Sequence, residues 1–338
     1  MSDAMTQERP AGPKATANVI LDVEDLKIHF PVYGGLIQKQ VGAVKAVDGV
    51  SFQVFEGETL GLVGESGCGK STTGLAVLRM LPVTAGRIVF EGVNITHHDQ
   101  KQMRPIRRRM QMVYQDPFGS LDPRMTVGEI VGEPLVIHKL HGEKKERRER
   151  VMSLLEMVGL RHDMIDRYPH QFSGGQRQRI SIARALAVEP RLLICDEPVS
   201  ALDVSIQAQV VNLFQELQER LGISSIFVAH DLAVVRHVSQ RIAVMYLGTI
   251  VEISSRDELY ANPKHPYTQA LMAAIPVANP VIEAARAHQI ITGEVPSAQR
   301  PPPGCRFHPR CVHAMPICSE QTPELKNHGS SKVACHLF

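Results

Sequence analysis

The sequence contains no uninterrupted apolar run of the roughly 18 residues that a helix needs to cross a membrane. Its opening stretch, MSDAMTQERPAGPKATA, lacks the apolar core of a signal peptide and predicts a disordered leader over residues 1–18. The net charge of +2 provides no global basic field of the kind that attracts nucleic acid. These absences predict a cytosolic chain that does not bind nucleic acid but could dock on a membrane protein.

Cysteine is also scarce, with six in 338 residues, yet four of the six fall within the last 34 residues. Because cytosolic thiols are kept reduced, such a cluster favours metal ligands over disulfides. The gaps of five, six and sixteen residues are wider than the cysteine pairs of short zinc modules, whereas a [4Fe–4S] cluster tolerates them. We expect a structural [4Fe–4S] cluster, with Zn²⁺ or unligated thiols as alternatives, on Cys305, Cys311, Cys318 and Cys335. If one cysteine is not a ligand, the substitutes are His308, His313 and His336.

A phosphate-binding loop follows a short apolar run at residues 60–63, in TLGLVGESGCGKST. The spacing Gly-x-x-x-x-Gly-Lys-Ser and the order strand, loop, helix are what this motif requires. The glycines let backbone N–H groups face phosphate oxygens, Lys70 is expected to reach the β- and γ-phosphates, and the Ser71 hydroxyl is expected to bind Mg²⁺. The expected nucleotide-binding residues here are Gly64, Glu65, Ser66, Gly67, Cys68, Gly69, Lys70, Ser71 and Thr72; Cys68 fills a variable position and has no assigned chemistry.

A second apolar strand, RLLICDEP, ends in two carboxylates. Asp196 at the end of a buried strand fits a position beside Mg²⁺. Glu197 is then placed to act as general base on an attacking water. Strands often end in surface acids, but this pair follows a complete phosphate loop, so the sequence predicts nucleotide hydrolysis.

A third motif, FSGGQ, stands just before a helical stretch at residues 177–187. A serine and two glycines at a helix start form another anion-binding end. One chain does not need two such sites for one γ-phosphate. We therefore expect the nucleotide of a second chain to be bound by Ser173, Gly174, Gly175 and Gln176.

With these motifs in order, the sequence resembles the ATP-binding subunits of ABC transporters over roughly residues 19–255. FSGGQ is similar to the signature motif of that family, with Phe172 in place of leucine. VYQDP resembles the Q-loop, SALD the D-loop and FVAHDL the switch region, and these supply Gln115, Asp203 and His230. The resemblance implies that Gln115 contacts Mg²⁺ or the attacking water and that His230 hydrogen-bonds the γ-phosphate.

The same resemblance implies an aromatic side chain that stacks on adenine. Phe30 stands at the corresponding position. Core packing is the alternative role for Phe30, and Tyr33 is the competing aromatic residue.

Two further stretches narrow the resemblance to one subfamily. QDPFGSLDPRMTVGE, after Gln115, is similar to the version found in peptide permeases, and the triplet His265-Pro266-Tyr267 also marks dipeptide and oligopeptide permease ATPases. The chain most resembles the second ATPase subunit of bacterial dipeptide permeases, and some tails in that group carry a [4Fe–4S] cluster.

The fold class implied is α/β: a phosphate-loop NTPase core of the RecA type, with an ABC-type β-subdomain, an inserted helical subdomain and a small cysteine-rich C-terminal tail domain. The nucleotide-binding domain is expected over residues 19–258, with the helical subdomain at about residues 116–172 and a small cysteine-bearing extension at residues 259–338. The helical period predicts one buried helix face with Val151, Leu154, Leu155 and Val158.

The implied activity is hydrolysis of ATP with Mg²⁺, driving import of dipeptides or short peptides, with oligopeptides, nickel or haem as alternative cargo. The implied partners are two polytopic permease subunits, a related second ATPase (a homodimer being the alternative) and, indirectly, an extracytoplasmic solute-binding protein. The chain would lie on the cytoplasmic face of the bacterial inner membrane. A non-transport ABC ATPase and an iron–sulfur regulator are rivals, but the sequence shows no sustained heptads, no second ATPase domain and no DNA-binding module.

Overall fold

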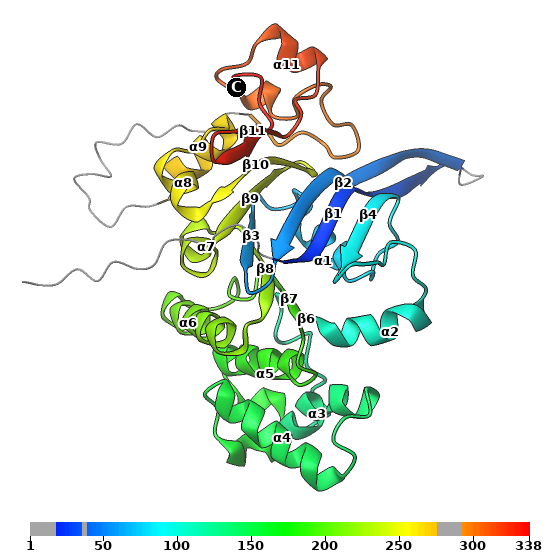
Figure 1. The fold of residues 1–338 in the computed structure, drawn as a ribbon, viewed down its shortest axis with the longest axis vertical. Coiled ribbons are helices and arrows are strands. Elements are labelled where there is room, and N and C mark those ends of the chain that lie inside the picture. The colour runs from blue at the N-terminus through cyan, green and yellow to red at the C-terminus, as the bar shows by residue number, and fades with distance from the viewer. Residues whose placement is uncertain (1–17, 36–38, 276–292) are drawn as a thin grey trace, which may run out of the picture.

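The computed structural model describes residues 18–35, 39–275 and 293–338 (Figure 1). The leader predicted at residues 1–18 lies outside these ranges except for Asn18, and so does a part of the predicted extension, residues 276–292. The described strands form a four-stranded and an eight-stranded sheet. Within the same residues, no helix is both long and apolar enough to cross a membrane.

The smaller sheet is antiparallel and has the strand order β2-β1-β4-β5. Its buried side chains include Leu21, Val23 and Ile28, which alternate with more exposed neighbours as expected for a sheet with one face on the core. The strands are β1 (Val19–Gly34), β2 (Lys39–Phe55), β4 (Ala85–Phe90) and β5 (Val93–Asn94).

The larger sheet has the order β11-β12-β10-β9-β3-β8-β7-β6. Its central strands β9, β3, β8, β7 and β6 pair in parallel, and β10, β12 and β11 add antiparallel strands at one edge. The strands are β3 (Thr59–Val63), β6 (Met110–Val113), β7 (Leu192–Asp196), β8 (Ser224–Ala229), β9 (Arg241–Tyr246), β10 (Thr249–Ser255), β11 (Lys326–His328) and β12 (Ser331–Val333).

Helices connect the parallel strands and cover the larger sheet. The α-helices are α1 (Lys70–Val77), α2 (Gln100–Arg109), α3 (Val127–Ile137), α4 (Lys144–Met157), α5 (Gly174–Leu186), α6 (Val204–Leu221), α7 (Leu232–Val238), α8 (Arg256–Ala261), α9 (Pro266–Ala273) and α11 (Pro316–Glu320). Short 3₁₀ turns are η1 (His162–Asp166), η2 (Pro169–Gln171) and η3 (His308–Arg310).

The apolar runs identified in the sequence form the centre of the larger sheet. Every residue of β3 and β7 is buried, as expected for parallel strands covered on both faces. The predicted α/β core is therefore confirmed, with one helix after each of the strands that carry the motifs.

The helices α3, α4 and α5 pack together at the end of the molecule opposite the C-terminal segment (Figure 1). Val151, Leu154 and Leu155 of α4 are buried, and Val158 directly after the helix is also buried. The predicted apolar face of this helix is therefore confirmed, and most of the charged residues in the first half of α4 are exposed.

The C-terminal segment extends the central sheet instead of forming a separate cysteine-rich domain. Strand β12 pairs with β10, with Val333 opposite Glu252 and Lys332 opposite Ile253. The Ala334 amide donates to the Val251 carbonyl at 2.9 Å. The expected cysteine-rich tail domain is therefore not supported, because backbone pairing with β10 makes this segment part of the sheet of the ATPase core.

The His-Pro-Tyr triplet caps helix α9. The Nδ1 atom of His265 accepts the Tyr267 amide at 3.0 Å, and Pro266 occupies the first helical position, where its missing N–H costs nothing. The buried carboxylate of Glu252 accepts the amides of Lys264 and His265, each at 2.9 Å. Burial lowers the pKa of His265 to about 3, so this imidazole stays neutral in the folded chain.

Replacing His265 with asparagine is expected to reduce the acid sensitivity of the fold. The unfolded chain binds a proton at His265 near pH 6.5 and the folded chain only near pH 3, so stability falls as the pH drops below about 6.5. The wild type should lose about 2 kcal/mol through His265 between pH 7 and pH 5. Asparagine retains an acceptor for the cap but cannot take up that proton.

The measurement is urea unfolding at pH 7 and pH 5 for both proteins. The exposed His97 supplies the matched control, His97→Asn, which should show the wild-type pH dependence. An equal pH dependence in wild type and His265→Asn would contradict a buried neutral imidazole.

Candidate nucleotide site

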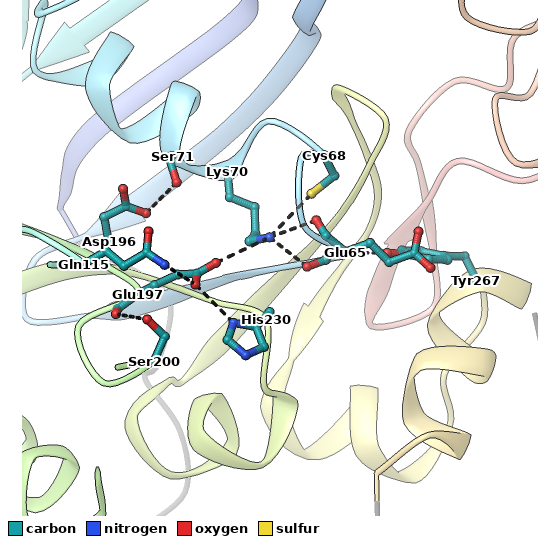
Figure 2. Close-up of polar contacts among 11 residues, drawn as sticks. Glu65, Cys68, Lys70, Ser71, Gln115, Asp196, Glu197, Ser200, His230 and Tyr267 are labelled. Carbon is teal, nitrogen blue, oxygen red and sulfur yellow. Dashed lines mark hydrogen bonds and ion pairs between the residues drawn. The ribbon is translucent and has the colours of Figure 1, made fainter. Parts of the chain in front are cut away.

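The parallel strands bring three motifs to one edge of the larger sheet. Val63 of β3 lies opposite Ala229 of β8, and Asp196 of β7 lies opposite Val228. The phosphate loop, Glu197 and His230 begin directly after these three strand ends. Figure 2 shows the side chains of Lys70, Glu197 and His230 converging from the segments that follow the three strands.

Two glycines of the phosphate loop have no tolerable substitute. Gly64 has a φ of +155° and Gly69 a φ of +106°. A Cβ atom on Gly64 would lie 2.1 Å from the Met245 carbonyl oxygen, and one on Gly69 would lie 2.2 Å from the Ala46 carbonyl oxygen. Both glycines therefore allow the loop to approach neighbouring backbone that any side chain would displace.

Lys70, the first residue of α1, points back into the loop. Its Nζ atom donates to the carbonyl oxygens of Gly64 at 2.8 Å and Glu65 at 3.0 Å, and it lies 4.0 Å from a carboxylate oxygen of Glu197. The Lys70 side chain is only 3% exposed. A buried ammonium group is thus held between the phosphate loop and the candidate base.

Ser71 and Asp196 form the part of the site that suits a divalent cation. The Ser71 hydroxyl donates to a carboxylate oxygen of Asp196 at 2.8 Å. Burial raises the pKa of Asp196, and the hydrogen bond from Ser71 opposes that shift. A buried carboxylate beside a hydroxyl supplies the hard oxygen ligands that Mg²⁺ prefers, so these two residues fit the expected ion.

Glu197 is the point on which the other candidate catalytic residues converge. One of its carboxylate oxygens lies 3.2 Å from Gln115 Nε2, which donates to it, and 3.1 Å from His230 Nδ1 (Figure 2). Glu197 has a φ of +44°, which is uncommon for a residue with a side chain and marks local backbone strain. The Ser200 hydroxyl donates to its backbone carbonyl at 3.0 Å.

The remaining candidate residues lie apart from this carboxylate. Ser173 caps α5 by accepting the Gln176 amide, and the Gln176 side chain accepts the Ser173 amide in return. Asp203 precedes α6 and is exposed, as is Ser173. Phe30 and Tyr33 are 39% and 59% exposed, so Phe30 does not pack in the core, and both aromatic rings are free to meet a ligand.

Sequence reasoning missed two contacts that the C-terminal part makes with the phosphate loop. Tyr267 accepts a hydrogen bond from the Glu65 amide, and Arg310 forms an ion pair with the Glu65 carboxylate. The only sequence signal for the contact of Tyr267 was the His-Pro-Tyr triplet, which we interpret as a marker of the subfamily. Nothing in the sequence distinguishes Arg310 from the other basic residues of the tail.

The four tail cysteines lie near one another, but the expected metal site is not supported. Burial first, and then the neighbouring thiols of Cys318, Cys335 and Cys311, raise the pKa of Cys305 to about 11. Over residues 18–35, 39–275 and 293–338, no group of three or more His, Cys, Asp or Glu side chains is arranged to hold a metal ion. The described residues therefore give no support to the expected [4Fe–4S] or zinc staple, and they show the tail held by strand β12 and by apolar packing of Phe307.

Comparisons with known proteins agree with this geometry. The ABC transporter family model matches residues 47–200, and the model for the C-terminal region of oligopeptide/dipeptide transporters matches residues 251–318. The oligopeptide transport ATP-binding protein AppF of Bacillus subtilis is 52% identical over 96% of this chain and 99% of its own length. The oligopeptide transport ATP-binding protein OppF of Escherichia coli is 50% identical over 94% of this chain and 96% of its own length.

Solved structures show the same core. An ATP-binding cassette dimer in a post-hydrolysis state, bound to ADP and phosphate, has a TM-score of 0.62 and 28% identity, covering 70% of this chain and 98% of its own. CbiO1 from Clostridium perfringens, part of an ABC transporter complex, also has a TM-score of 0.62, with 30% identity, covering 72% of this chain and 91% of its own.

The fold, the phosphate loop and the side chains that meet at Glu197 define an ABC-type ATPase. Because two full-length relatives are at least 50% identical, the chain belongs to the ATP-binding subunits of the oligopeptide/dipeptide ABC transporter family.

Glu197→Gln is expected to retain ATP binding and to lose at least about 10²-fold in turnover, because the amide cannot take a proton from water. Turnover is measured as phosphate release by the assembled complex, and binding is measured by titration with ATP. The control is Glu216→Gln on the exposed side of α6, which should behave as wild type. Near-normal hydrolysis by Glu197→Gln would remove this residue from the role of base.

Proposed function

We propose that this chain is the ATP-hydrolysing subunit that powers the import of short peptides through a membrane ABC permease. The main support is the match along nearly the whole chain to oligopeptide transport ATP-binding proteins, at 52% and 50% identity. The match to the transporter-specific C-terminal model lies outside the ATPase core and supports the same assignment.

In the proposed reaction, Glu197 takes a proton from the water that attacks the γ-phosphorus of ATP. The bond from that phosphorus to the oxygen bridging to the β-phosphate breaks, which leaves ADP and phosphate. Gln115 and His230 share the Glu197 carboxylate oxygen and would orient the water and the γ-phosphate. Mg²⁺ bound by Ser71 and Asp196, with Gln115, would supply positive charge against the β- and γ-phosphate oxygens.

The second half of each site is proposed to come from another ATPase chain. Ser173, Gly174 and Gly175 stand at the start of α5, where the helix end favours a phosphate group. Val204, next to Asp203, is 82% exposed, which is unusual for a large apolar side chain and favours a covered position in a dimer. The partner is proposed to be a related but different chain. Phe30 or Tyr33 would stack on adenine.

The helical region is proposed as the contact with two polytopic permease subunits at the cytoplasmic face of the bacterial inner membrane. Three apolar side chains are exposed there: Phe118 after the Q-loop, at 60%, and Val136 and Ile137 at the end of α3, at 59% and 46%. Closing of the ATPase pair on ATP and its reopening after hydrolysis would drive the permease between inward-facing and outward-facing states. We propose dipeptides or other short peptides as cargo, delivered by an extracytoplasmic binding protein.

A tagged copy of this chain, purified from detergent-solubilised membranes, is expected to bring down two polytopic subunits and a second ATPase. ATP hydrolysis by that complex should rise when peptide and binding protein are supplied on the extracytoplasmic side of vesicles. Recovery of the tagged chain alone, or with ribosomes or DNA, would contradict a transport role. A free amino acid in place of peptide is the control substrate.

Changes in the phosphate loop and in the signature motif are expected to impair different sites of the ATPase pair. Lys70→Ala should weaken nucleotide binding at the site built on this chain's own loop, since it removes the buried ammonium group. Ser173→Ala should impair the site built on the partner's loop. Photo-crosslinking of labelled ATP, followed by separation of the two chains, assigns each defect. If both variants lost label on this chain alone, the shared-site model would be wrong.

A further inference from the structure

The phosphate loop is contacted by segments that lie more than 170 residues further along the chain. The Glu65 amide donates to the Tyr267 hydroxyl of α9 at 2.9 Å (Figure 2). The Arg310 guanidinium, in η3, donates to both carboxylate oxygens of Glu65, at 2.9 and 3.2 Å. In addition, the Gly248 amide donates to the Cys68 carbonyl at 2.8 Å. Glu65 is thus held through its backbone and its side chain at once.

The groups that hold Glu65 are themselves rigidly packed. Tyr267 is fully buried, and its ring lies 4.7 Å from that of Tyr246 and 5.4 Å from that of Phe307, measured between centroids. The Tyr246 and Phe307 rings meet edge to face at 5.2 Å. These three rings come from α9, β9 and the C-terminal segment, so one aromatic cluster fixes the position of the Tyr267 hydroxyl.

The ion pair between Arg310 and Glu65 is shielded from water. The Arg310 side chain is 7% exposed and that of Glu65 is 26% exposed. Although burial opposes it, pairing with Glu65 raises the pKa of Arg310, and the guanidinium therefore remains charged. A two-pronged, charge-assisted pair of this kind restricts both distance and orientation.

Glu65 is adjacent to the atoms that hold the phosphate-loop lysine. Lys70 Nζ donates to the backbone carbonyls of Gly64 and Glu65, so a displacement of Glu65 moves two of the acceptors that position Lys70. Tyr267 and Arg310 therefore contact a residue whose own carbonyl helps to place the ammonium group, next to Gly64, which supplies the other carbonyl.

We propose that Tyr267 and Arg310 are positioning residues for the ATPase site: they fix Glu65 and thereby hold the phosphate loop in the shape that binds ATP. The inference rests on the proposed ATPase function and adds a role for the C-terminal extension, which would contribute to nucleotide affinity as well as to the fold. Loss of either contact increases the freedom of the loop before ATP binds, so the cost appears in ATP affinity more than in the chemical step.

Conservative variants separate this role from a purely structural one. Tyr267→Phe removes only the hydroxyl and keeps the packed ring. Arg310→Lys keeps the charge but loses the two-pronged pair. Each variant is expected to raise the Kd and the KM for ATP by about three- to tenfold, the usual effect of losing one hydrogen bond, with kcat within about twofold of wild type.

Two matched controls lie in the same part of the molecule. Tyr260→Phe removes a partly buried hydroxyl that donates to the Leu232 carbonyl and makes no recorded contact with the loop. Arg306→Lys weakens an anchor of the tail to Asp48 of β2. Both controls are expected to leave the KM for ATP within about twofold of wild type, whatever their effect on thermal unfolding.

The experiment measures ATP binding by the purified full-length chain with isothermal titration, and KM and kcat for ATP in the assembled complex. A double-mutant cycle completes it: in a Glu65→Gln background, Arg310→Lys should have less than half of its original effect on ATP affinity, because the pair is already broken. Thermal unfolding reports whether each variant is folded. If Arg310→Lys or Glu65→Gln fails to fold, Tyr267→Phe still decides the question, and if Tyr267→Phe fails, Arg310→Lys and the cycle decide it.

The outcomes separate failure of the proposed ATPase function from failure of the positioning role. If the wild type neither bound nor hydrolysed ATP, the proposed function would fail. If the wild type bound ATP and the folded Tyr267→Phe and Arg310→Lys variants bound it equally well, only the positioning role would be overturned. Equal rises in KM for these variants and for the two controls would assign the effect to general loosening of the tail, and that too would overturn it.

Discussion

The parallel register of β3, β7 and β8 determines where the reactive side chains lie. With Val63 opposite Ala229 and Asp196 opposite Val228, three strands end at the same level. Every residue of β3 and β7 and all but one residue of β8 are buried, so a shift of one residue would exchange the side chains that pack on the two covered faces. The meeting of the phosphate loop, Glu197 and His230 is therefore a consequence of core packing, even though these groups occur far apart in the sequence.

The local parts of the site could be predicted from the sequence because each motif carries its own structural context. An apolar run before Gly64 and a helical segment from Lys70 are sufficient to place the phosphate loop. The apolar face of α4 was predictable for a similar reason, because its period is local. These are cases in which the residues that give the signal are also the residues that form the element.

The parts that sequence reasoning missed depend on contacts between distant segments. Strand β12 has only three residues, so no alternation marks it, and its place is set by the free edge of β10. The pair of Glu65 with Arg310 spans 245 positions. The four cysteines gave a strong compositional signal for a metal, whereas the anchoring of the tail through β12 had no local signal in the sequence.

The 245 positions between Glu65 and Arg310 also matter while the chain is being translated. The phosphate loop leaves the ribosome well before Arg310 exists, and at about 5–20 residues per second roughly 12–50 seconds separate the two. During that interval β10 has no β12 beside it and Glu65 has no guanidinium partner. A nascent chain would therefore reach its full affinity for ATP only as translation finishes. A fragment released early would compete weakly with intact subunits for nucleotide.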